Sequence, residues 1–200
     1  MERRKSNVKK WTAFALALFM AVAALPFAVP AEAAGEITVE HVRDRDNQVK
    51  YLDGGTTSWY TANGNISYCL DPTKNGLSDT VMTGRIIDRS GNEPMYKALY
   101  YLYGGPGYEE SLFDSSLGTD DKYGLTHVVA SYIVNGDAAW DAIGFGKDMA
   151  LSIVEALRSR DMPPKDFQVF YYNEGHGTVQ AFAGWRYNPE GYLSIEKESS

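Results

Sequence analysis

Cysteine is almost absent from this chain, since Cys69 is the only one among 200 residues. A disulfide within the chain is therefore excluded, although exported proteins normally pair their cysteines. A single thiol can be a buried inert group, half of an intermolecular bridge or a reactive group. The residues around Cys69 support the reactive group best.

Histidine is also scarce, with only His41, His127 and His176. Three histidines at these spacings and one cysteine do not form a zinc-binding pattern. We therefore expect no metal and no other cofactor. The chain also lacks internal repeats and low-complexity segments, which favours one compact domain.

Only one apolar run is long, and it extends from Trp11 to Val29. Five basic residues precede it, and the small-x-small sequence Ala31-Glu32-Ala33 follows it. This order is typical of a cleaved export signal, here residues 1–34. No second run is long enough to cross a bilayer, so we expect no membrane segment in the mature domain. The protein is expected at the cell surface, in the cell wall or outside the cell.

Positive charge is in deficit, with 19 Lys and Arg against 26 Asp and Glu. Without residues 1–34 these numbers fall to 14 and 24, which gives the mature chain a net charge of about −10. Such a surface repels nucleic acid and anionic lipid. It would attract lysine-rich protein partners at low salt, and we expect no nucleic-acid partner.

Strand patterns flank a helical middle. Apolar alternation predicts strands at 37–39, 49–52, 66–70, 167–172 and 178–185. The first helix is expected to begin at Asn92 and to stop at Gly104, and the second follows Asp120 or Asp121. The third carries an apolar stripe, which comprises Phe145, Met149, Ile153 and Leu157. Residues 35–190 are thus predicted as an α+β domain, an antiparallel β-barrel or sandwich with a helical insertion.

In the predicted strands, two side chains each project from the face opposite the apolar one. Cys69 projects from the face opposite Ile66, Tyr68 and Leu70. Gln180 likewise projects opposite an apolar face, which comprises Val179, Ala181, Ala183 and Trp185. The alternation therefore argues against an inert thiol buried on the apolar face.

Three motifs in this order resemble the thioester domains of Gram-positive surface adhesins. They are Tyr68-Cys69-Leu70-Asp71-Pro72, the helix motif Leu125-Thr126-His127-Val128-Val129-Ala130-Ser131-Tyr132, and Val179-Gln180-Ala181-Phe182-Ala183. The family often has glutamine where this chain has His127, and alanine where it has Val129. The resemblance covers roughly residues 40–187.

The resemblance implies an internal thioester between Cys69 and Gln180, formed with loss of ammonia. Such a step needs the sulfur held against the side-chain carbonyl, a donor that polarises this carbonyl and a group that takes the thiol proton. His127 is the candidate for proton transfer, because the helix phase places it off the apolar stripe; the alternative is a hydrogen-bonded residue of the helix surface. His176 is a weaker candidate.

The same resemblance implies that amines open the bond. A lysine of a host cell-surface or matrix protein would then become joined to Gln180, which makes this a single-turnover adhesin domain and not an enzyme. The chain is expected to be a monomer. Tyr68, Trp185 and Thr126 are the residues expected to shelter the bond from water, although aromatic residues at such spacings can also be plain core.

The last ten residues, 191–200, resemble the first strand of an immunoglobulin-like (Cna B-type) stalk repeat. In such repeats a lysine at the position of Lys197 forms an isopeptide bond, while the alternative is an exposed lysine on a frayed tail.

Two other functions are open on the sequence alone. One is a secreted cysteine hydrolase or transpeptidase, with Cys69 as nucleophile and a histidine as base. The other is a non-covalent host-binding module in which Cys69 is incidental.

Overall fold

The computed structural model describes residues 35–189 except 53, 144, 145 and 176. The export signal, the tail with Lys197, Phe145 and His176 lie outside the described residues, so the predictions made for them stay predictions. Within the described part of the chain, no helix combines the length and the apolar character that a membrane span requires.

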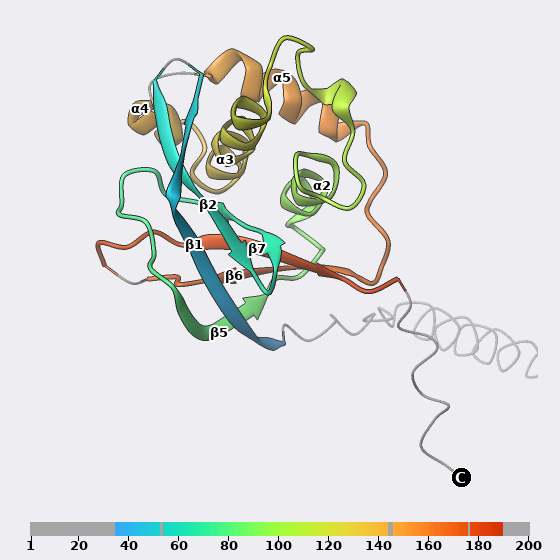
Figure 1. Cartoon of the computed structure of the whole chain (residues 1–200). Coiled ribbons are helices and arrows are strands. Elements are labelled where there is room, and N and C mark those ends of the chain that lie inside the picture. The colour runs from blue at the N-terminus through green and yellow to red at the C-terminus, as the bar shows by residue number, and fades with distance from the viewer. Residues whose placement is uncertain (1–34, 53, 144–145, 176, 190–200) are drawn as a thin grey trace, which may run out of the picture. The chain divides into compact units, whose positions relative to one another are not determined.

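One antiparallel sheet of seven strands forms the base of the domain (Figure 1). Its strands are β1 (Glu36–Tyr51), β2 (Gly55–Ala62), β3 (Asn65–Ile66), β4 (Tyr68–Cys69), β5 (Thr80–Ile86), β6 (Phe167–Tyr172) and β7 (Phe182–Tyr187). Their order across the sheet is β3-β2-β1-β5-β6-β7-β4. Asn63 and Gly64 both have positive φ values, 52° and 78°, and make the two-residue turn between β2 and β3.

The two edges of this sheet come from neighbouring residues, which curls the sheet on itself. Only Ser67 separates β3 at one edge from β4 at the other. The Ser67 amide donates to the carbonyl of Tyr60 on β2, and the Leu70 amide donates to the carbonyl of Ala181 just before β7. The result is a nearly closed antiparallel barrel, so the predicted fold class is confirmed.

Within the described residues, the helices lie between β5 and β6 in the sequence, and they gather on one side of the sheet in Figure 1. They are α2 (Glu93–Tyr101), the 3₁₀ turn η1 (Glu110–Leu112), α3 (Thr119–Asn135), α4 (Ala138–Ile143) and α5 (Lys147–Arg158). Asn92 precedes α2 and Pro94 lies in its first turn, as the sequence predicts. The helical insertion is therefore confirmed.

Several predicted details are wrong. Segments 37–39 and 49–52 belong largely to one strand, β1, whose pairing with β2 shifts between Asp44 and Gln48. Strand β5 was not predicted, because its residues alternate only weakly in polarity. The last strand begins at Phe182 instead of 178, and Met149 is 37% exposed instead of lying in the buried stripe of α5.

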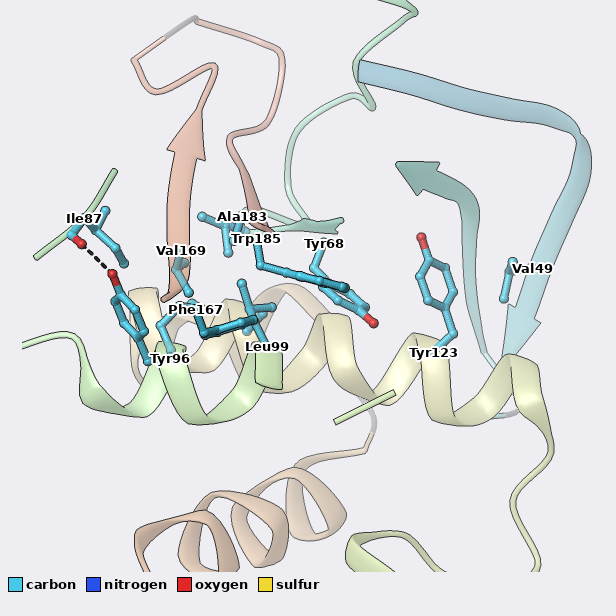
Figure 2. Close-up of a cluster of buried hydrophobic side chains, with 13 residues drawn as sticks. Val49, Tyr68, Ile87, Tyr96, Leu99, Tyr123, Phe167, Val169, Ala183 and Trp185 are labelled. Carbon is cyan, nitrogen blue, oxygen red and sulfur yellow. Dashed lines mark hydrogen bonds between the residues drawn. The ribbon is translucent and has the colours of Figure 1, made fainter. Parts of the chain in front are cut away.

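The core has two parts relevant to function, one on each face of the sheet. Tyr68, Tyr123 and Trp185 belong to a cluster between the sheet and the helices (Figure 2). A second cluster comprises Val39, Tyr60, Ala62, Cys69, Phe170, Tyr172 and Phe182. The rings of Tyr60 and Phe182 meet at 5.0 Å, which links β2 to β7 inside the barrel.

Candidate functional site

Strand pairing brings the predicted cysteine and glutamine together. Strands β4 and β7 are antiparallel neighbours, and Cys69 is the register partner of Phe182. Gln180 lies two residues before Phe182 and so on the same face, diagonally adjacent to Cys69. Both residues line one pocket of about 270 Å³. The two distant segments therefore lie side by side, while contact between the Cys69 sulfur and the Gln180 side-chain carbonyl stays a prediction.

His127 of α3 contacts Cys69 at two atoms. Its Nδ1 lies 3.0 Å from the Cys69 sulfur and also 3.0 Å from the Cys69 amide nitrogen, which donates to it. Because an amide can only donate, Nδ1 is the acceptor nitrogen and the ring proton is carried by Nε2. The same lone pair faces the thiol, so His127 is placed to accept the proton that the sulfur must lose.

Helix α3 holds β4 through one line of side chains spaced four residues apart. His127 accepts the amide of Cys69, while Ser131 and Asn135 donate to the carbonyl of Leu70 at 3.2 and 2.6 Å. The sequence places His127 and Ser131 on one helix face, but it does not single out Asn135. These contacts fix the peptide group before Cys69 and the peptide group after Leu70.

The alternative interpretation of His127, as a hydrogen-bonded residue of the helix surface, is wrong. His127 is only 3% exposed, and every residue of α3 from Tyr123 to Ser131 is buried. The helix is wrapped by the sheet, α2 and α5, so its polar residues are enclosed as well as its apolar ones. The face of Cys69 is likewise buried, with 9% of the residue exposed.

Burial keeps both groups of this pair neutral at rest. It raises the pKa of the Cys69 thiol to about 12, with the Asp71 charge adding to the effect of desolvation. Desolvation by burial also lowers the pKa of His127 to about 3. The carboxylate of Asp71 accepts bonds from the Thr73 amide and hydroxyl and pairs with Lys74.

The backbone of Gln180 is held by hydrogen bonds, whereas its side-chain oxygen accepts none from the described residues. Its amide donates to the carbonyl of Asn75, and its carbonyl accepts from the side chain of Asn173. The residue is 6% exposed, and its side-chain oxygen has no hydrogen-bond partner among the described residues. The polarising donor expected from the sequence is therefore not found in the described part of the chain.

The pocket is lined differently from the sequence-based expectation. Tyr68, Trp185 and Thr126 are not among its lining residues. Tyr68 and Trp185 pack in the helix-side cluster, where the Tyr68 ring lies 5.1 Å from that of His127. Thr126 donates to the Lys122 carbonyl within α3. The lining residues are Arg43, Gln48, Tyr51, Thr56, Thr57, Ser58, Tyr60, Cys69, Pro72, Lys74, Asn75, Gly76 and Gln180.

Metal chemistry finds no support in the described ranges. No group of three or more His, Cys, Asp or Glu side chains in residues 35–189, apart from the four undescribed positions, could hold an ion. A larger pocket of about 370 Å³ shares Tyr51 and Thr56 with the cysteine pocket, but neither cysteine nor histidine lines it. The chemistry of the site is thus that of a thiol, an imidazole and a carboxamide.

Residues 41–164 match the family described as thioester domain, and the chain belongs to this family. The match covers more than half of the chain and includes Cys69 and His127, whereas Gln180 lies beyond its end. No curated protein is similar enough to this chain to count as a relative.

Solved structures offer distant similarities. The N-terminal thioester domain of a surface protein from Clostridium perfringens is 12% identical with a TM-score of 0.49, over 74% of this chain and 98% of that one. A cysteine-to-alanine variant of such a domain from the same organism is 11% identical with a TM-score of 0.49, covering 75% and 99%. The N-terminal domain of the Streptococcus pyogenes pilus tip adhesin Cpa is 11% identical with a TM-score of 0.44, covering 76% and 94%.

Proposed function

We propose that Cys69 and Gln180 form an internal thioester and that amines on a partner protein open it. The observation that carries this proposal is the 3.0 Å contact between the Cys69 sulfur and the unprotonated nitrogen of His127, in the pocket that Gln180 also lines. Family membership supports it independently.

The chemistry proceeds in two balanced steps. In the first, the Cys69 sulfur attacks the side-chain carbonyl carbon of Gln180, the thiol proton passes by way of His127 to the departing amide nitrogen, and ammonia leaves. In the second, an amine attacks the thioester carbonyl, an amide forms at Gln180 and the Cys69 thiol is released. The buried pocket makes the first step intramolecular and limits access of water to the product.

The biological setting proposed here is covalent attachment outside the cell. An export signal followed by a thioester domain favours a monomeric surface adhesin whose target is a lysine of a host cell-surface or matrix protein. The acidic mature chain supports encounter with lysine-rich proteins. Each domain would react once, because the amide product does not regenerate the thioester.

Intact-mass measurement of the unreduced mature protein tests this chemistry. We expect a mass one ammonia below that of the sequence, no reaction with a thiol alkylator, and uptake of methylamine at Gln180 with a newly alkylatable Cys69. The matched control is Gln180→Ala, which should have its full sequence mass and a free thiol. A wild-type protein of full mass with a reactive thiol would refute the proposal.

A cysteine hydrolase is the second candidate, because the Cys69–His127 contact also resembles a nucleophile and its base. The environment of the thiol argues against it. Hydrolase cysteines are activated by a lowered pKa, often at a helix N-terminus, whereas Cys69 lies in a strand and its pKa is raised. The same mass measurement separates the two, since a hydrolase retains its full mass.

A further inference from the structure

The charge of the cysteine pocket is opposite to that of the protein. Two basic residues, Arg43 and Lys74, belong to its described lining, and no acidic side chain does. The mature chain as a whole carries about ten more acidic than basic groups. The acidic protein therefore attracts a lysine-rich partner at long range, but the pocket itself is positively charged. Entry of an unpaired lysine ammonium group into this pocket is disfavoured.

Of the two cations, only Arg43 is left without a carboxylate. Lys74 pairs with Asp71 at 3.0 Å. Within the described ranges, no carboxylate lies within 4.0 Å of the Arg43 guanidinium. Asp79 is nearby, but it accepts the Arg43 backbone amide at 2.8 Å.

The Arg43 side chain is nevertheless held in place. It is half-buried, its Nε donates to the Ser58 hydroxyl at 3.0 Å, and its guanidinium carbon lies 5.8 Å from the centre of the Tyr60 ring. With Nε used by Ser58, the terminal nitrogens are the donors left for a ligand. A fixed guanidinium of this kind is suited to bind a carboxylate with two parallel hydrogen bonds.

We propose that Arg43 determines which amines react, by pairing with a carboxylate close in sequence to the attacking lysine. The preferred targets are then lysines flanked by glutamate or aspartate. This inference rests on the thioester proposed above. The carboxylate neutralises the pocket and anchors the partner, so that the lysine nitrogen is oriented toward the carbonyl of Gln180.

The test compares a reference peptide with a set of variant peptides, all with blocked N-termini. The reference holds a single lysine among glycines. In each variant, one glycine within three residues of the lysine is replaced by glutamate. Rates of adduct formation are followed by intact mass. We expect the best glutamate peptide to react about three- to tenfold faster than the glycine peptide. The preference should shrink in high salt, because screening weakens the pair.

Three variants locate the effect. Arg43→Gln should lower the rate ratio toward one, and Arg43→Lys should retain only part of the preference. Arg45→Gln is the matched control, because Arg45 is an exposed cation of the same strand that does not line the pocket. It should keep the wild-type ratio.

The outcomes separate the inference from the function beneath it. A wild-type protein that does not take up methylamine would contradict the thioester itself. Methylamine uptake together with equal rates for all peptides would overturn the role of Arg43 alone, and so would an unchanged ratio in Arg43→Gln. Because the wild-type ratio is decisive by itself, the test does not depend on the folding of any variant.

Discussion

At the scale of single residues, one nitrogen of His127 combines two roles. Nδ1 accepts the amide of Cys69 and faces its sulfur at the same distance, 3.0 Å. The first contact positions the strand, and the second is the one through which we propose that the thiol proton leaves. Different substitutions separate these roles, since a glutamine oxygen can accept an amide hydrogen bond but is not a base at neutral pH.

We predict that His127→Ala slows ammonia loss by about 100-fold or more, because it removes the base and the positioning contact together. His127→Gln should be intermediate. The measurement is a time course of intact mass after refolding. His41→Gln is the control, since His41 is also a buried histidine among the described residues and contacts Tyr172 instead of Cys69. Wild-type kinetics in His127→Ala would show that the imidazole plays no part.

At the scale of elements, helix α3 fixes the position of the strand that carries the thiol. Its contacts with the backbone of residues 69 and 70 come from three successive turns of the helix. A buried helix can do this because its polar side chains need hydrogen-bond partners, and these three find them in the segment that the helix covers. The helix also approaches β1 closely at Gly124.

Asn135 is predicted to matter through its bond to Leu70, the residue after β4, although its side chain also donates to Ser131 within α3. Asn135→Ala removes a donor to the Leu70 carbonyl, and we expect a loss of about 1 kcal/mol in the free energy of unfolding together with slower thioester formation. Denaturant unfolding and the mass time course measure the two effects. Asn92→Ala, whose side chain bonds only within the turn before α2, should leave ammonia loss unchanged.

Gly124 is predicted to be required for packing of α3 against Tyr51. A Cβ at Gly124 would lie 2.0 Å from the Tyr51 ring, whereas the nearest atom to a Cβ at Gly118, just before the same helix, is 3.7 Å away. Gly124→Ala should therefore destabilise the domain by about 1–3 kcal/mol and disturb the pocket wall. Gly118→Ala should cost less than about 1 kcal/mol. Similar denaturation midpoints for the two variants would contradict this account.

At the scale of the whole molecule, the proposed bond would join two strands that are already neighbours in the fold but lie more than 100 residues apart in the chain. The bond would therefore stabilise the fold mainly by closing a loop in the unfolded chain, which lowers the conformational entropy of the unfolded state. By the chain-entropy estimate this amounts to about 4–5 kcal/mol.

We predict that Cys69→Ala lowers the melting temperature by roughly 10 °C, given this loss of stability. Methylamine treatment of the wild type should produce a similar decrease, because it opens the bond while leaving the sulfur in place. The comparison separates loss of the crosslink from loss of a buried side chain. Equal melting temperatures for all three samples would count against a crosslink.

Acid should also destabilise the domain. Burial lowers the pKa of His127 to about 3 and that of His41 to about 4. Below the unfolded value near 6.5 the unfolded chain binds protons that the folded chain does not, so stability falls as pH decreases from 6.5 toward these values. The loss between pH 6.5 and 4.5 is at most about 2 kcal/mol for each histidine. Urea unfolding at several pH values should show that the free energy of unfolding depends less on pH in His41→Gln than in the wild type.

The sequence determined the class of the fold and the helical insertion, because local periodicity carries this information. Short motifs singled out Cys69 and Gln180, which line one pocket in the structure, and the bond between them stays a prediction. Strand β5 is missed because its alternation in polarity is weak, and β1 is predicted as two separate strands because a shift in its pairing interrupts the pattern.

Only the tertiary structure decided the environment of the site. Burial of His127 depends on elements that wrap α3 from several sides, and a helical pattern cannot show that a polar face is enclosed. Arg43 and Asn135 reach the site from positions 26 and 66 residues away from Cys69, and no local pattern relates them. The physical reason is that the period of a helix or strand determines which of its side chains share a face. The distance between side chains of different elements depends instead on how the sheet closes.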